Sequence, residues 1–272
     1  MPLPVIKVFV FIFGSMIGSF LNVCIFRLPL GKSVVKPRSY CPSCGKTIPW
    51  HDNIPLLSYL FLMGKCRFCR MRIPTRYFLI ELITAAAFLL FFNIYGFGFE
   101  LLYYAVFISG LIIATFVDIQ HRIIPDEISV GGIIVGFLLN LSRFILPSSN
   151  HQALSQVVNS FLGIIIGGGI IYLTAKIFDL VYFKMLKKPP IDGETESMGG
   201  GDVKLLAMIG AFLGWQGAVL TFFIAPFFGL VVGVANLLIK KEHTIPYGPF
   251  LSLAAVIVLF WSGPIVRIFF IH

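Results

Sequence analysis

The chain has 272 residues, of which 58% are hydrophobic and only 12% charged, with a mean hydropathy of +0.94 and a formal net charge of +9. Soluble domains are about half apolar and about a quarter charged, so this composition excludes an ordinary soluble domain and indicates a polytopic membrane protein. The basic residues gather in particular loops, and no RNA-binding pattern accompanies the aromatic residues near them. We therefore expect membrane topology, and not nucleic-acid binding, to explain the positive charge.

The first apolar stretch, residues 1–26, is long enough to cross the hydrocarbon core, which takes about 20 helical residues. It has no small-residue cleavage site and a basic segment follows it, so we interpret it as a retained transmembrane helix. Gly14 and Gly18 recur at helical spacing, which favours close contact with another helix. Asn22 is a polar exception that we expect to hydrogen-bond a neighbouring helix.

Residues 27–76 form a loop that carries ten Lys and Arg residues against one acid, Asp52. By the positive-inside rule this loop is cytoplasmic, which places the N-terminus on the opposite side of the membrane. A segment of this size cannot bury a large core, so we expect a covalent or metal crosslink to hold it.

Two Cys-x-x-Cys pairs, Cys41/Cys44 and Cys66/Cys69, lie in this loop with 21 residues between them. Four thiolates from two such turns can surround one tetrahedral zinc ion. A cytosolic location disfavours two disulfides, and a redox dithiol pair is the weaker alternative. The sequence therefore predicts a small cytoplasmic zinc-binding loop domain, with a closed structural site.

Seven further helices are predicted after this loop, which makes the chain an all-α polytopic membrane protein with about eight transmembrane helices, the last seven in a membrane domain over residues 77–272. The loops that fall on the cytoplasmic side hold Lys and Arg, whereas the opposite loops hold none, so charge and parity agree. We expect the loop at 183–202 to be mobile and solvated. The predicted spans are 77–95, 101–118, 127–146, 157–182, 203–214, 217–239 and 248–271.

Two aspartates end up at the same membrane face in this topology. Asp118 ends the third span and Asp202 begins the sixth, and an even number of crossings separates them. Gly199, Gly200 and Gly201 precede Asp202 and predict a loop that lets the backbone approach another segment closely. Two neighbouring carboxyls cannot both ionise cheaply, so one can take a proton from water while the other polarises a peptide carbonyl. This pattern indicates aspartic-protease chemistry at a membrane surface.

Other polar or small residues in the membrane region receive structural assignments. Asp126 follows Pro125 at the start of a helix, so we predict that it caps that helix. His121 and Arg122 are assigned to the cytoplasmic interface, and Asp179 is a weaker candidate for chemistry. The glycines within the fifth span do not lie in a βαβ unit, so they predict close helix packing and not a phosphate site. They are Gly163, Gly167, Gly168 and Gly169.

The Gly-x-Gly-Asp pattern at 199–202 and its continuation to Gly210 resemble the type IV prepilin peptidases. Asp118 and the Ile-Pro-Asp that follows at 124–126 match the first catalytic segment of that family. Further matching segments lie at 18–23, 27–29, 37–44, 50–55 and 64–69, so the resemblance covers most of the chain.

The resemblance implies a bifunctional enzyme of the bacterial inner membrane. It would cleave the leader of type IV prepilins or type II secretion pseudopilins at the cytoplasmic face, with Asp118 and Asp202 as the catalytic pair. It would then methylate the new N-terminus with S-adenosylmethionine. The family associates methylation with the cysteine-bearing region, which makes Asp52, Asn53 and Glu81 candidates for binding the methyl donor.

Three other hypotheses remain open at this point. Intramembrane acids also occur in transporters, although both aspartates are predicted at one face and no internal repeat is visible. A membrane anchor whose zinc loop recruits a partner would leave Asp118 and the glycine segment without a purpose. An intramembrane protease of the presenilin type would not require the four cysteines.

Overall fold

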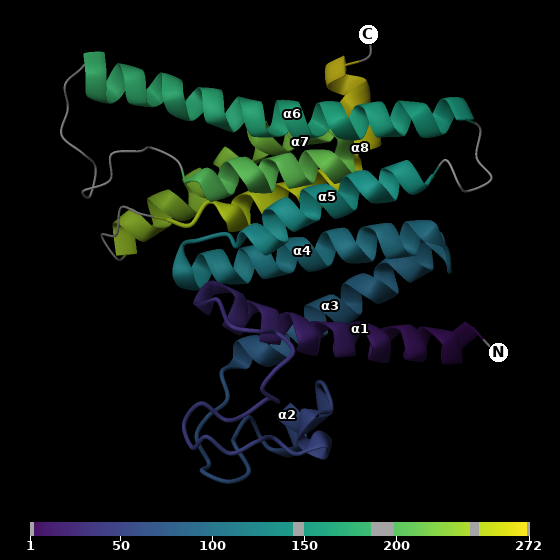
Figure 1. Cartoon of the computed structure of the whole chain (residues 1–272), viewed down its shortest axis with the longest axis vertical. Coiled ribbons are helices and arrows are strands. Elements are labelled where there is room, and N and C mark those ends of the chain that lie inside the picture. Colours follow the sequence, from purple (N-terminus) through teal and green to yellow (C-terminus); the bar gives the residue numbers. More distant parts are fainter. Residues whose placement is uncertain (1–2, 144–149, 186–198, 240–244, 271–272) are drawn as a thin grey trace. The chain divides into compact units, whose positions relative to one another are not determined.

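The computed structural model describes residues 3–143, 150–185, 199–239 and 245–270, and its regular elements are helices, as predicted. Five described helices are long and apolar enough to cross a membrane. A shorter apolar segment, Gly248–Trp261, is the first part of the last helix. Figure 1 shows the order of the main elements. Their bounds are α1 Leu3–Arg27, α2 Leu57–Phe61, α3 Thr75–Tyr95, α4 Phe99–His121, α5 Asp126–Ser142, α6 Asn150–Asp179, α7 Gly200–Ile239 and α8 Gly248–Phe270, with 3-10 turns at Leu28–Leu30 and Trp50–Asn53 and a π-helical turn at Leu180–Met185.

The chain forms two compact units, Met1–Ile113 (unit 1) and Ala114–His272 (unit 2), and the boundary falls within α4. Unit 1 contains α1, α3, the first part of α4 and the cysteine-bearing loop. Unit 2 contains the end of α4 with Asp118, followed by α5 to α8.

Helices α1 and α3 of unit 1 pack closely where α1 presents glycines. A Cβ at Gly18 would lie 2.7 Å from the Cα of Glu81, and a Cβ at Gly14 would lie 2.9 Å from the Cα of Ala85. The amide of Asn22 donates a hydrogen bond to the carbonyl oxygen of Tyr77 on α3, at 3.0 Å. The expected roles of these α1 residues in helix contact are therefore confirmed.

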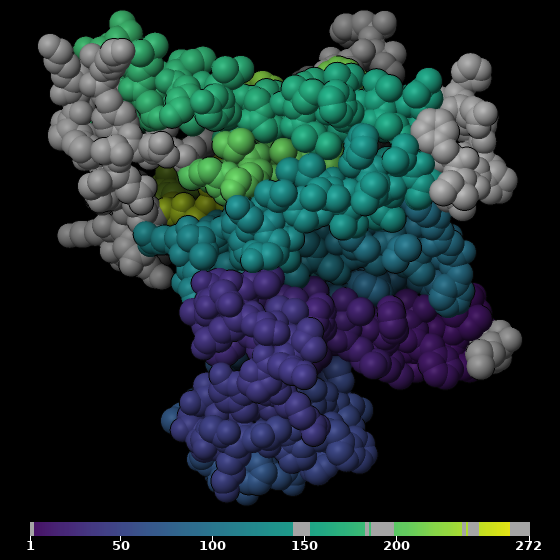
Figure 2. All heavy atoms as spheres, viewed as in Figure 1, coloured from purple at the N-terminus to yellow at the C-terminus, as the bar shows by residue number. Residues whose placement is uncertain are grey.

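The cysteine-bearing loop folds into two similar turns. Gly45 donates its amide to the carbonyl of Cys41, and Arg70 donates its amide to that of Cys66, at 2.8 and 3.0 Å. Both donors have positive φ, 70° for Gly45 and 59° for Arg70, so the second turn uses a side-chain-bearing residue in a left-handed conformation. In the space-filling view the loop forms a lobe of purple to blue atoms (Figure 2).

Helices α6 and α7 of unit 2 meet at their glycines. A Cβ at Gly163 would overlap the carbonyl of Gly210, and one at Gly167 would lie 2.6 Å from the carbonyl oxygen of Leu206. Gly163 and Gly167 therefore allow two backbones to touch, which confirms the packing role predicted for them.

The sequence predicts separate helices at 203–214 and 217–239, and α7, Gly200–Ile239, consists of two helices that meet at a kink. The kink is at Gly214, which leaves helical geometry with φ 73° and ψ 179°. A straight helix of this length would extend about 60 Å, twice the roughly 30 Å of a hydrocarbon core. The break at Gly214 therefore coincides with the predicted end of a span, but residues 215–216 are helical. Most of the loop predicted at 183–202 lies outside the described residues.

Candidate active site

Asp118 lies near the end of α4 and is buried, with 6% of its surface exposed. Its carboxylate oxygen Oδ2 accepts a hydrogen bond from the backbone amide of Gly248, at 2.8 Å. Its own carbonyl accepts the amide of Arg122, whose φ of 55° ends the helix in a left-handed residue. Asp118 is thus fixed both by the end of its own helix and by the first residue of α8.

Asp202 is the third residue of α7, and its amide bonds to the carbonyl of Gly199, at 3.1 Å. Gly200 and Gly201 lie in the first helical turn and not in the loop that the sequence predicts. A Cβ at Gly201 would lie 3.2 Å from the Cβ of Ile124, so this glycine lets α7 begin close to the segment between α4 and α5.

Asp118 and Asp202 are close enough to interact electrostatically, and Tyr247 is close enough to Asp202 to be affected by its charge. Burial, together with the nearby charge of Asp202, raises the pKa of Tyr247 to about 12, so its hydroxyl stays protonated. The arrangement joins two carboxyls, a backbone donor and a neutral phenol at one place. Such a group can carry out general acid–base chemistry on a peptide bond.

Tyr247 and Gly248 were not predicted as site residues. The only local signal is the pair of prolines around them, Pro246 and Pro249, which marks a turn before a helix. Gly248 reaches Asp118 across 130 residues of sequence, and no local pattern encodes such a contact.

Asp126 does not cap α5, contrary to the prediction. It is the first residue of the helix, follows the cap residue Pro125, and makes no side-chain capping bond. Its Oδ1 accepts a hydrogen bond from Nζ of Lys204 on α7, at 2.6 Å. The ion pair ties α5 to α7 two residues beyond Asp202, and the side chains of Lys204 and Asp126 are 41% and 64% exposed.

Cys41, Cys44, Cys66 and Cys69 of the loop bring their Sγ atoms within 4.8 Å of one another. Cys41 Sγ and Cys69 Sγ lie 3.8 Å apart. A tetrahedral site with Zn–S bonds of about 2.3 Å places its sulfurs about 3.8 Å apart, so the cluster fits zinc. Burial opposes ionisation of Cys41, but the amides of Cys44 and Ser43 and the neighbouring thiols lower its pKa to about 7. Cys41 therefore favours the thiolate form. At Cys69 a backbone amide acts in the same direction, but burial and the neighbouring thiols raise its pKa to about 11.

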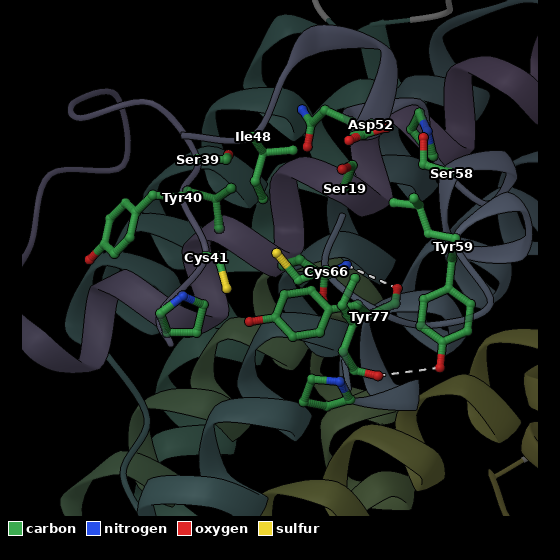
Figure 3. Close-up of a pocket in the computed structure, with 18 of the residues that line it drawn as sticks. Ser19, Ser39, Tyr40, Cys41, Ile48, Asp52, Ser58, Tyr59, Cys66 and Tyr77 are labelled. Atoms are coloured by element: carbon green, nitrogen blue, oxygen red, sulfur yellow. Dashed lines mark hydrogen bonds between the residues drawn. The ribbon is translucent and has the colours of Figure 1, made fainter. Parts of the chain in front are cut away.

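A cavity of about 570 Å³ lies beside the cysteines in unit 1 (Figure 3). The three candidates for binding the methyl donor, Asp52, Asn53 and Glu81, all line it, as does Tyr77. Its volume falls in the range of about 300–1,000 Å³ that is usual for small-molecule sites. The cavity therefore gathers the polar groups of the loop and of α3 around one space.

Asp52 is held at the cavity by Arg67 through two hydrogen bonds, of 2.6 and 2.5 Å. These bonds lower the pKa of Asp52. Burial alone would raise it, but the charges of Arg67 and His51 lower it further. Asp52 is therefore a fixed carboxylate whose charge Arg67 already balances.

Glu81 on α3 reaches the loop at a strained turn. Its Oε2 accepts the amide of Leu56, at 2.7 Å. Leu56 has φ 62° and ψ −53°, and Leu57 donates its amide to the carbonyl of Pro55 at 2.7 Å, which defines a γ-turn of the rarer hand. A leucine in this conformation is kept only where its surroundings hold it, and Glu81 supplies one such contact.

Comparison with known proteins gives two family matches. The Bacterial Peptidase A24 N-terminal domain matches residues 12–95, and the Type IV leader peptidase family matches residues 105–234. The first match includes the cysteines, the cavity residues and Glu81. The second includes Asp118 and Asp202, and ends before Gly248.

Curated relatives include three proteins named prepilin leader peptidase/N-methyltransferase. The protein of Myxococcus xanthus is 36% identical over 86% of this chain and 64% of its own length. That of Aeromonas salmonicida is 32% identical over 95% of this chain and 91% of its own length, and that of Pseudomonas aeruginosa is 35% identical over 93% and 90%. No solved structure matches the chain. From the two family matches and the near-complete alignment with these relatives, the chain belongs to the type IV leader peptidase family.

Proposed function

We propose that this protein cleaves the leader peptide of type IV prepilins or type II secretion pseudopilins and then methylates the new N-terminal amine. The relatives that align with nearly the whole chain carry both activities in their names. The observation that supports peptide cleavage most strongly is the meeting of Asp118 and Asp202 inside the leader-peptidase match.

Cleavage needs one carboxylate and one carboxylic acid. The carboxylate takes a proton from water while the water oxygen bonds to the scissile carbonyl carbon, and the acid gives its proton to the carbonyl oxygen. The tetrahedral intermediate then collapses with rupture of the C–N bond, and a proton passes to the leaving amine. Asp118 and Asp202 supply the two groups, and the first turn of α7 brings Asp202 to the segment between α4 and α5.

We assign methylation to the cavity of unit 1. S-adenosylmethionine, when bound, supplies a methyl group from a positively charged sulfur. Glu81 and Asp52 place carboxylate oxygens at the cavity wall, and Tyr77 places an aromatic ring there. Carboxylates and aromatic faces both attract cations, and Asn53 adds an amide able to bond hydroxyl or amine groups.

The four cysteines serve this cavity as a structural zinc site. Cys41 and Cys66 belong to the cysteine cluster and also line the cavity, so a bound metal would fix the cavity wall. A site with four cysteine ligands has no open position for substrate. Zinc therefore holds the loop in place and takes no part in either reaction.

We place the protein in the bacterial inner membrane with eight crossings, counting the two halves of α7, together with α5 and α8, as spans. This count puts the aspartates and the basic loop on the cytoplasmic side and the N-terminus in the periplasm, in line with the distribution of Lys and Arg. The transport hypothesis receives no support from the relatives.

A mass assay on the protein in liposomes tests the proposal. A prepilin incubated with the protein alone should lose its leader, and addition of S-adenosylmethionine should make the mature product one methyl group heavier. Cleavage without the added methyl would restrict the protein to a peptidase. Intact substrate with several prepilins and pseudopilins would reject the proposed function.

A further inference from the structure

The first turn of α8 has one backbone donor that points outside its own turn. The amides of Phe250 and Leu251 bond to the carbonyl of Tyr247, at 3.0 and 3.2 Å, and Pro249 has no amide hydrogen. The amide of Gly248 donates instead to Asp118 Oδ2, at 2.8 Å. An aspartate of α4 thus accepts the hydrogen bond offered by the N-terminus of a distant helix.

The space around Gly248 shows how closely the two segments fit. Gly248 is buried, and a Cβ at this position would lie 2.8 Å from Asp118 Oδ2 and 3.3 Å from the Cδ1 of Ile124. A contact of 2.8 Å with a carbon is too short, so any side chain at 248 would push the Asp118 carboxylate away. Glycine at 248 is therefore required for the hydrogen bond at its present length.

The two aspartates have different surroundings. Asp118 accepts the amide of Gly248 at the positive end of the α8 dipole, and Arg122 adds a positive charge from its own helix. No described residue donates a hydrogen bond to the carboxyl of Asp202, and among the described residues the charged group that acts on it is Asp118. A donor and a positive charge favour the ionised form of a carboxyl, and their absence beside a second acid favours the protonated form.

We propose that the amide of Gly248 is a positioning group that holds Asp118 as the ionised carboxylate, so that Asp118 is the general base toward water and Asp202 is the acid toward the scissile carbonyl. This inference rests on the proposed function and assigns separate roles within that site. It also places the start of α8, which lies outside the leader-peptidase match, in the catalytic arrangement.

The first experiment compares Gly248→Ala with Gly131→Ala in liposomes on one prepilin. Gly131 lies on α5 of the same unit, and a Cβ there meets no atom within 4 Å. Displacement of a catalytic group by about 1 Å can cost about 100-fold in rate, so Gly248→Ala should lower kcat by about 10- to 100-fold and leave KM within about twofold. Gly131→Ala should cleave like the unaltered protein.

Methylation of a pilin that already lacks its leader monitors folding of the same preparations. Gly248→Ala should retain this activity, because the proposed cavity lies in unit 1. An unchanged kcat for leader cleavage in Gly248→Ala would overturn the inference. So would a parallel loss of cleavage and methylation, or an equal loss in Gly131→Ala, since either would indicate a general packing defect. Absence of cleavage in the unaltered protein would reject the proposed function instead.

A second measurement tests the contact without activity. The double variant Asp118→Cys, Gly248→Cys should form a disulfide under mild oxidation, identified by the mass of the joined peptides. The matched pair Ile119→Cys, Gly248→Cys moves one cysteine to an exposed position and should stay reduced. Equal crosslinking of both pairs, or of neither, would contradict the geometry on which the inference depends.

The roles themselves are tested by the residual activity of two amide variants. The side-chain amide introduced by Asp202→Asn can still donate a hydrogen bond to a carbonyl, whereas the one introduced by Asp118→Asn cannot take a proton from water. Asp202→Asn should therefore retain measurably more cleavage than Asp118→Asn. The reverse order would overturn the assignment of Asp118 as the base.

Discussion

Glu81 of unit 1 and Asp118 of unit 2 make the same kind of contact. Each carboxyl lies on a membrane-length helix and accepts a backbone amide from a segment far away in sequence, Leu56 at 2.7 Å and Gly248 at 2.8 Å. In unit 1 the donor belongs to a strained turn of the cysteine-bearing loop. In unit 2 it belongs to the first residue of another helix.

The difference lies in the second acid near each of them. Asp118 has Asp202 beside it, with no described hydrogen-bond donor to the Asp202 carboxyl. Asp52, which lines the same cavity as Glu81, accepts hydrogen bonds from Nε and Nη2 of Arg67. A hydrogen bond from a backbone amide to a buried carboxyl is therefore only a structural contact. The carboxyl can take part in acid–base chemistry when a second carboxyl beside it is available for protonation.

Removal of zinc should have the largest effect and should be confined to unit 1. Small zinc modules gain about 10–16 kcal/mol from the metal, so Cys41→Ser should lose zinc and expose the loop to trypsin. Methylation should fall with it, while leader cleavage persists. Metal analysis measures the zinc content and limited proteolysis measures exposure of the loop. Cleavage and methylation assays measure the two activities.

The matched control is Cys24→Ser, because Cys24 is buried in α1 and does not belong to the cluster. It should keep zinc. If the purified unaltered protein contains no zinc while its four loop cysteines are reduced, the structural zinc site is contradicted. Loss of cleavage in Cys41→Ser would show that the two reactions depend on one another.

Loss of either carboxyl in unit 2 should remove cleavage and spare methylation. General acid–base groups contribute about 10²- to 10⁴-fold, so Asp118→Asn and Asp202→Asn should each lower the rate of leader cleavage by at least that amount. Expression should be unchanged, because the side-chain carbonyl that Asp118→Asn retains can still accept the amide of Gly248. Rates on a prepilin and on a mature pilin compare the two activities, and full cleavage by the Asp118 variant would move the role to Asp126.

Changes at Glu81 should give the opposite result. Glu81→Gln keeps an acceptor for the Leu56 amide but removes the charge, so methylation of a mature pilin should fall about 10- to 150-fold while cleavage is unchanged, in line with a charge-assisted contact of about 1.5–3 kcal/mol. Glu81→Leu also leaves the buried amide unpaired and should destabilise the loop by about 1–3 kcal/mol. Equal methylation by Glu81→Gln and the unaltered protein would leave Glu81 as a purely structural contact.

The ion pair between Asp126 and Lys204 should have the smallest effect. Exposed pairs contribute about 0.2–1 kcal/mol, so Asp126→Asn should change thermal stability little and weaken cleavage only slightly. High salt should reduce even this difference, because exposed charges are screened. A loss comparable to that of Asp202→Asn would place Asp126 in the reacting pair.

The sequence predicted the features that repeat locally or follow from topology. Cys-x-x-Cys spacing predicted the cluster, the alternation of basic loops predicted that Asp118 and Asp202 share one face, and the spacing of Gly14 and Gly18 predicted a close helix contact. These signals are readable because each arises within a few residues or from the number of crossings.

Contacts between a side chain and a distant backbone amide were not predicted. The bond from Gly248 to Asp118 and that from Leu56 to Glu81 depend on helix positions that no local pattern specifies. For the same reason Asp126 was expected to cap its own helix, although Lys204 of α7 binds it. The break between the two helices of α7 was predicted, but it lies at the single residue Gly214 and not at residues 215–216 as expected.

The central claim is that two separate sites act in turn on one substrate, and a two-substrate mass assay tests it most directly. The assay presents an intact prepilin and a mature, unmethylated pilin to the unaltered protein, Asp202→Asn and Glu81→Gln, with S-adenosylmethionine present. We predict that Asp202→Asn methylates the mature pilin and cleaves only a small fraction of the prepilin, whereas Glu81→Gln cleaves the prepilin and yields mostly unmethylated product. Loss of both activities in either variant would contradict separate sites and indicate one shared active site.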